Sequence, residues 1–149
     1  MISVSDSATI LRPRAEVYAF VADLDNLPRW QSEVVSTHVA TQGPVRVGMR
    51  FTEDVRIGRE TVEAHCEITE LAEGTLLGFT ASSPALDYSG KLDFTDADGG
   101  TRVDITATFA LKGARRLLEP AFGGEVRRGV GYELDTLKRL LEEGDRRPS

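Results

Sequence analysis

One acidic side chain lies among apolar residues in the strand predicted over residues 48–57. Glu53 shares its parity with Met49, Phe51, Val55 and Ile57. Because successive side chains of a strand point to opposite faces, the Glu53 carboxyl should face the interior. Burial raises the pKa of a carboxyl, so Glu53 is the candidate acid that hydrogen-bonds or protonates a ligand carbonyl. The alternative is a bulge or strand end that returns Glu53 to solvent.

Two aromatic residues with polar tips are further candidates. Tyr88 shares a strand face with Leu92 and Phe94, so its hydroxyl either orients a ligand or bonds to the backbone of the core. Trp30 follows Asn26 and Pro28. It forms either a wall of a cavity mouth or a structural plug beneath the short helices.

The histidines and the cysteine favour neither a metal site nor a disulfide. The chain has one cysteine and two histidines. His65 lies between Glu63 and Glu67 on a polar strand face, where the three side chains are too spread to converge on zinc at about 2.0–2.2 Å. We expect His65 and His38 to be in solvent and Cys66 in the core as an inert small hydrophobe. Neither a metal nor another cofactor is expected.

Length and charge limit the class of protein. The 149 residues fit one domain, expected over residues 1–144 with a disordered tail at 145–149. The net charge of -6 argues against a nucleic-acid partner. No apolar run approaches the ~20 residues that span a bilayer, and the N-terminus lacks the features of a signal peptide. We expect a cytoplasmic monomer or weak homodimer without membrane insertion.

Alternation of polar and apolar residues predicts seven strands. A helix that follows Pro13, with an apolar stripe from Val17 to Leu24, and a short helix or turn carrying Trp30 separate the first strand from the others. Short connectors with turn residues, such as Glu73-Gly74, favour antiparallel pairing. Each strand has one apolar face, so one side of the sheet should be covered. The predicted strands are 2–10, 32–41, 48–57, 60–72, 75–81, 86–96 and 101–111.

The cover is predicted to be one long helix over residues 115–143. Val126, Val130, Leu134, Leu137 and Leu141 form its apolar stripe. Each interior glycine costs up to about 1 kcal/mol relative to alanine. Because Pro120, Gly123 and Gly124 lie in its first part, we expect a kink or a loose opening turn over 120–124. The order is strand, two short helices, six strands and a long helix.

Two segments resemble a known family. The opening Ile10–Trp30 contains an apolar strand end, Pro13, a helix, and an Asn-x-Pro-x-Trp run. It resembles the polyketide cyclase/dehydrase-like group of the SRPBCC (START-like) superfamily, and residues 115–142 are similar to the long terminal helix of that family. The resemblance implies an α+β helix-grip fold, in which a bent antiparallel sheet surrounds the helix and leaves a hydrophobic cavity. Members include aromatase/cyclases, lipid and quinone carriers, hormone receptors and chaperone activators, and the fold does not select among them.

The sequence thus favours binding of a small hydrophobic molecule, lipid-like or aromatic, between sheet and helix. The alternative is a polyketide aromatase/cyclase that uses Glu53 as its cavity acid. The inward faces offer few groups for acid–base chemistry, which favours binding over catalysis. The expected ligand-binding residues are Trp30, Phe51, Glu53, Val55, Phe79, Tyr88, Ile105, Phe109, Phe122, Val130 and Leu134.

Overall fold

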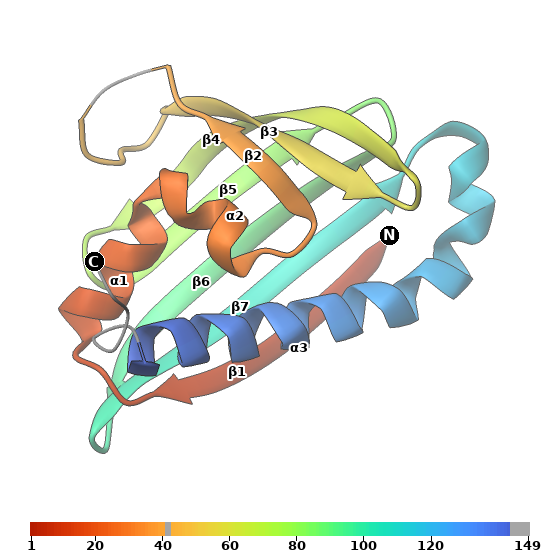
Figure 1. The fold of residues 1–149 in the computed structure, drawn as a ribbon. Coiled ribbons are helices and arrows are strands. Elements are labelled where there is room, and N and C mark those ends of the chain that lie inside the picture. Colours follow the sequence, from red (N-terminus) through yellow and green to blue (C-terminus); the bar gives the residue numbers. More distant parts are fainter. Residues whose placement is uncertain (41–42, 144–149) are drawn as a thin grey trace.

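The computed structural model describes residues 1–40 and 43–143, and the tail predicted at 145–149 lies outside them. The described residues form an antiparallel sheet in the order β1-β7-β6-β5-β4-β3-β2, with the long helix α3 lying across one face (Figure 1). The predicted α+β architecture is therefore confirmed. The strands are β1 (Ile2–Ile10), β2 (Val34–His38), β3 (Arg50–Ile57), β4 (Glu60–Ala72), β5 (Leu76–Ser82), β6 (Leu86–Ala97) and β7 (Gly100–Leu111).

Consecutive strands from β2 to β7 are joined as neighbours, and β1 closes the far edge against β7. Ile2 faces Phe109 and Ile10 faces Thr101 in that pairing. The tight turns before β5 and β7 contain Gly74 and Gly99 at φ of 82° and 75°. Glycine populates this left-handed region without the steric cost that other residues meet. The turn chemistry seen in the sequence therefore sets the hairpin positions.

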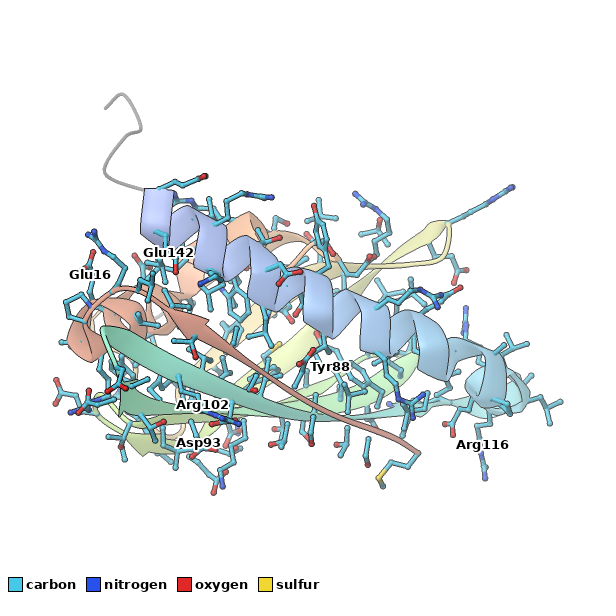
Figure 2. The ribbon with its side chains drawn as sticks, turned by 90° about the horizontal axis from the view of Figure 1, so that it is seen from below. Glu16, Tyr88, Asp93, Arg102, Arg116 and Glu142 are labelled. Carbon is cyan, nitrogen blue, oxygen red and sulfur yellow. The ribbon has the colours of Figure 1, made fainter. Side chains whose placement is uncertain are left out.

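The helices lie on one side of the sheet. They are α1 (Arg14–Ala22), the 3₁₀ turn η1 (Leu24–Asn26), α2 (Leu27–Trp30), the 3₁₀ turn η2 (Gly113–Leu118) and α3 (Glu119–Glu143). Figure 2 shows Tyr88 in the space between sheet and α3, whereas Asp93 and Arg102 lie on the opposite face. The alternation in β6 and β7 thus assigns the inner and outer faces correctly.

The five residues of the predicted helical stripe are all buried, with exposed fractions of 9% or less. The start of the helix differs from the prediction. The loose turn is η2, and α3 runs without interruption from Glu119, one residue before Pro120. Proline is tolerated in a first helical turn because its missing N–H would have no intrahelical partner there.

Strand β2 is shorter than the predicted 32–41. The backbone N–H of Val34 donates to the carbonyl of Gln31 at 3.0 Å, which forms a turn directly after α2. The strand therefore begins at Val34, and Glu33 lies in the turn. The alternation of side chains between the two faces of β2 therefore does not extend to Glu33.

One end of the space between sheet and helix is tightly packed. Val17 and Val21 of α1, Phe94 of β6 and Leu137 of α3 are each at most 1% exposed. The rings of Tyr18 and Phe94 meet edge to face with centroids 5.5 Å apart. This end of the core holds α1 and the second half of α3 on the sheet.

Candidate functional site

A cavity of about 200 Å³ lies between the inner face of the sheet and the first half of α3. Strands β3, β5, β6 and β7 supply its floor and α3 its roof. Its lining includes eight of the eleven residues predicted from the sequence: Glu53, Val55, Phe79, Tyr88, Ile105, Phe109, Phe122 and Val130. The pattern of inward-facing positions therefore brings most of the predicted residues into one place.

Two glycines shape this cavity. Gly129 lies in its roof, where an added Cβ would meet no described atom within 4 Å apart from the adjacent residues and backbone of its own helix. Gly90 lies in its floor, where an added Cβ would come within 2.8 Å of the Phe79 ring. The ring of Phe79 can therefore lie across β6 only because position 90 has no side chain. The absence of a side chain at Gly129 keeps the space below α3 open. The absence of a side chain at Gly90 lets the Phe79 ring lie over β6.

Glu53 and Tyr88 form the polar centre of the lining. Glu53 is 2% exposed, and the Tyr88 hydroxyl donates to its Oε1 at 2.5 Å. The Tyr88 ring stacks on Phe109 and meets Phe79 edge to face, with centroids 6.1 and 6.2 Å apart. Within the described ranges, Oε2 of Glu53 has no hydrogen-bond partner. One oxygen of the acid is thus held in place, and the other is buried without a hydrogen-bond partner in the described chain.

Burial controls the protonation of this pair. Burial raises the pKa of Glu53, and the Tyr88 hydrogen bond lowers it by a smaller effect. Burial and the neighbouring Glu53 also raise the pKa of Tyr88, which keeps the phenol neutral. A protonated Glu53 can donate a hydrogen bond from Oε2, and an ionised one can accept a hydrogen bond there. The pair therefore suits a ligand with one polar group in an apolar body.

Two further carboxyl groups on the lining were not predicted from the sequence. Glu133 of α3 and Glu33 of the turn before β2 both reach the cavity. Burial, then Glu33, then Glu53 raise the pKa of Glu133 to about 8. The signal for Glu133 was present, because it lies seven residues after Val126 on the buried side of the helix. Glu33 was missed because its position depends on the turn that ends α2.

Three predicted residues lie outside the lining of this cavity. Leu134 is in the packed core at 1% exposure. Trp30 and Phe51 border a separate void of about 10 Å³ behind Glu53 and Phe79. Trp30 is 1% exposed, and its indole N–H has no acceptor in the described part of the chain. Trp30 therefore lies beside Glu53 and Phe79 at the smaller void and does not line the larger cavity.

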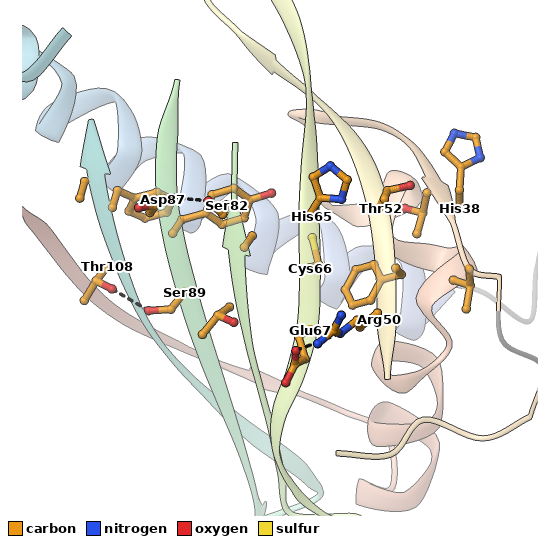
Figure 3. A pocket seen from close by; sticks show the side chains of 18 of the residues that line it. His38, Arg50, Thr52, His65, Cys66, Glu67, Ser82, Asp87, Ser89 and Thr108 are labelled. Carbon is orange, nitrogen blue, oxygen red and sulfur yellow. Dashed lines mark hydrogen bonds and ion pairs between the residues drawn. The ribbon is translucent and has the colours of Figure 1, made fainter. Parts of the chain in front are cut away.

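The outer face of the sheet carries a larger depression of about 1150 Å³ (Figure 3). Its polar side chains pair with one another, as in Ser82 with Asp87 at 2.7 Å and Ser89 with Thr108 at 2.6 Å. The side chain of His65 is 73% exposed, whereas Cys66 is buried. The predicted faces of β4 are confirmed. This depression is more open than the inner cavity, so it would enclose an apolar ligand less completely.

Residues 1–40 and 43–143 hold no group of three or more His, Cys, Asp or Glu side chains that could bind a metal ion. No helix in the same ranges has the length and apolar character needed to cross a membrane.

The family model described as polyketide cyclase / dehydrase and lipid transport matches residues 1–142. The chain belongs to this family, which confirms the resemblance seen in its opening and closing segments. No curated protein sequence shows significant similarity to the chain.

Solved structures share the fold at low identity. The protein TTHA0849 from Thermus thermophilus is similar at a TM-score of 0.78 and 23% identity, over 92% of this chain and 94% of that one. The Zhui aromatase/cyclase from Streptomyces sp. R1128 gives 0.77 and 15%, over 95% and 93%. A START superfamily protein from Mycobacterium smegmatis gives 0.70 and 15%, over 95% of each chain. These similarities establish the helix-grip fold.

Proposed function

We propose that this protein binds a small hydrophobic molecule in the cavity between the sheet and α3. The observation that carries the proposal is an apolar cavity of about 200 Å³ with one buried, half-satisfied carboxyl at its centre. Small-molecule sites are mostly apolar, with a few placed polar groups that orient the ligand. Membership of a family described by polyketide cyclisation and lipid transport supports the same class of ligand.

The size of the cavity limits the ligand. Sites for drug-sized ligands are about 300–1,000 Å³, and this one is smaller. A molecule of one or two rings, or a short acyl chain, fits better than a long polycyclic product. Its apolar body lies against Phe79, Phe109 and Phe122, and its polar group meets Oε2 of Glu53.

The first experiment is native mass spectrometry of the protein purified without denaturation, to detect a retained ligand. The second is a thermal-shift panel of short fatty acids, quinones and aromatic compounds. A ligand at one hundred times its Kd adds about 2.7 kcal/mol to the free energy of unfolding. The Gly129→Leu variant should abolish the shift, because a leucine side chain fills the roof where a Cβ meets open space. A panel with no shift, together with a protein that carries no ligand, would overturn the proposal.

The second candidate function is cyclisation of a polyketide with Glu53 as the acid. The raised pKa of Glu53 favours this alternative, because burial extends the pH range over which the carboxyl keeps its proton and can protonate a carbonyl oxygen. The test is conversion of a linear polyketide analogue, followed by the absorption of the aromatic product. Glu53→Gln should remove turnover while leaving the thermal shift by a non-reactive aromatic ligand in place. Binding without turnover in the unaltered protein rejects this alternative and leaves the first proposal standing.

A further inference from the structure

The acidic groups of the cavity come from three separate parts of the fold. Glu33 lies in the turn between α2 and β2, Glu53 on β3 and Glu133 on α3. All three line the same cavity, and both Glu33 and Glu53 act electrostatically on Glu133. Segments far apart in the sequence thus bring carboxyl groups to one end of an apolar space, with Glu33 at its exposed edge.

No cation in the described chain balances this group. The interactions of the Glu133 side chain there are with Glu33 and Glu53, and both are repulsive. The lining holds one basic residue, Arg56, which is exposed and has the outward parity of β3. The remaining polar side chains are Tyr88 and Cys66, which both interact with Glu53, and Gln31 and Ser89 on the lining. Glu125 also lies on the lining, two helical turns away, and is exposed.

Buried charges in proteins are normally paired, because the unpaired state is costly. Here an oxygen of Glu53, a side chain only 2% exposed, has no partner in residues 1–40 and 43–143. A ligand carbonyl would satisfy one protonated carboxyl and leave the repulsion among the others. A positively charged ligand group would satisfy Oε2 of Glu53 and remove the repulsion as well. A ligand carboxylate would add to it.

We propose that the cavity selects a hydrophobic organic cation, an aromatic or short aliphatic amine whose ammonium group lies among the carboxyl groups of Glu33, Glu53 and Glu133. The proposal rests on the proposed function and names the polar end of its ligand. The apolar body of the amine packs against Phe79, Phe109 and Phe122, and its ammonium donates hydrogen bonds to the carboxylates. Charge-assisted hydrogen bonds of this kind are about twice as strong as neutral ones.

The test uses compounds of equal shape that differ in charge. Calorimetric titration compares 1-naphthylmethylamine, 1-naphthylmethanol and 1-naphthoate, and then butylamine, butanol and butyrate. The salt concentration is set near 0.3 M so that binding to the acidic surface is screened. The amine of each set should bind roughly tenfold or more tightly than the alcohol, and the carboxylate should bind most weakly.

Two variants test whether the preference for the amine arises at Glu133. Glu133→Gln should reduce the preference for amine over alcohol by roughly tenfold. Asp135→Asn removes the same charge from an exposed position on the same helix and should leave both affinities unchanged. Because Glu133 must lose its proton to pair with the amine, amine affinity should also rise between pH 6 and pH 8.5, and alcohol affinity should not.

The outcomes separate the two proposals. If the alcohol binds as tightly as the amine, the selection of a cation is wrong and the hydrophobic site remains. If Asp135→Asn lowers the preference as much as Glu133→Gln does, the amine is held by the surface, and the inference is again wrong. If no compound of either set binds at millimolar concentration and native mass spectrometry finds no ligand, both proposals fail together.

Discussion

Apolar side chains line both ends of the space between the sheet and α3. They pack tightly at one end and leave a cavity at the other. At one end, α1 and the second half of α3 pack on the sheet, with Val17, Phe94 and Leu137 at most 1% exposed. At the other end, the first half of α3 covers a cavity of about 200 Å³. The aromatic side chains there, Phe79 and Phe109 among them, are only partly buried.

The composition of α3 accounts for much of this difference. Its second half places Leu134, Leu137 and Leu141 against the sheet. Its first half has Gly129 at the middle of the face that lines the cavity. A residue without a side chain cannot fill the space below it, so the helix covers the sheet there without closing on it. One end of the interior therefore supplies packing energy, and the other keeps room for a ligand.

Removing a large ring from each end gives the largest contrast. Phe94→Ala should lower the free energy of unfolding by about 3–5 kcal/mol, because it leaves a hole in a closely packed region. Phe79→Ala removes the same atoms from a wall that already borders empty space, and should cost no more than about 2 kcal/mol. Urea denaturation of both variants measures the difference. Equal losses would mean that the cavity end is packed as well as the other.

The next test concerns the hydrogen bond between Tyr88 and Glu53, at the end of the interior that contains the cavity. Tyr88→Phe leaves both oxygens of the buried Glu53 carboxyl without a partner, which should cost about 1–3 kcal/mol. The matched control is Tyr132→Phe on the exposed side of α3, which should change stability by less than about 0.5 kcal/mol. The comparison is made by chemical denaturation at neutral pH. Equal effects would place the Glu53 carboxyl in contact with water.

Glu133, on the lining of the cavity, should also make the free energy of unfolding depend on pH. The pKa of Glu133 is about 8 in the folded protein against 4.5 for the ordinary side chain. Between these values the folded state holds a proton that the unfolded state has released, so stability falls as pH rises from about 4.5 to about 8. Glu133→Gln should reduce this fall by more than about 1 kcal/mol between pH 5 and pH 8. Denaturation at both pH values, with Asp135→Asn as control, measures it; an unchanged slope would contradict the burial of Glu133.

The smallest expected effect comes from a single methyl group. Gly129→Ala adds a Cβ that meets no atom within 4 Å in the described structure. It should stabilise the protein by up to about 1 kcal/mol, because alanine is the better helix former. Gly100→Ala in the packed end provides the contrast, because its Cβ would lie 2.1 Å from the backbone oxygen of Ile10 and should destabilise the protein. Thermal melts of the two variants should therefore move in opposite directions.

The strands and the long helix followed from the sequence because their patterns are local. Alternation in β3 and β4 assigns Glu53 and Cys66 to the interior and His65 to solvent, and these positions do not depend on distant residues. The stripe from Val126 to Leu141 likewise fixes the buried face of α3. The family resemblance agrees with this arrangement over residues 1–142.

The cavity and its polar groups were decided by the tertiary structure. Phe51 has the parity of a cavity residue and Trp30 has the character of one, yet both border the separate void beside Glu53 and Phe79, where Trp30 packs from α2. Glu33 reaches the site through a turn that no periodic pattern describes. The meeting of Glu33, Glu53 and Glu133 depends on how the turn after α2, the middle of β3 and the middle of α3 approach one another. Local patterns determine which face of each element is buried, and only long-range packing determines which of those faces leave a space between them.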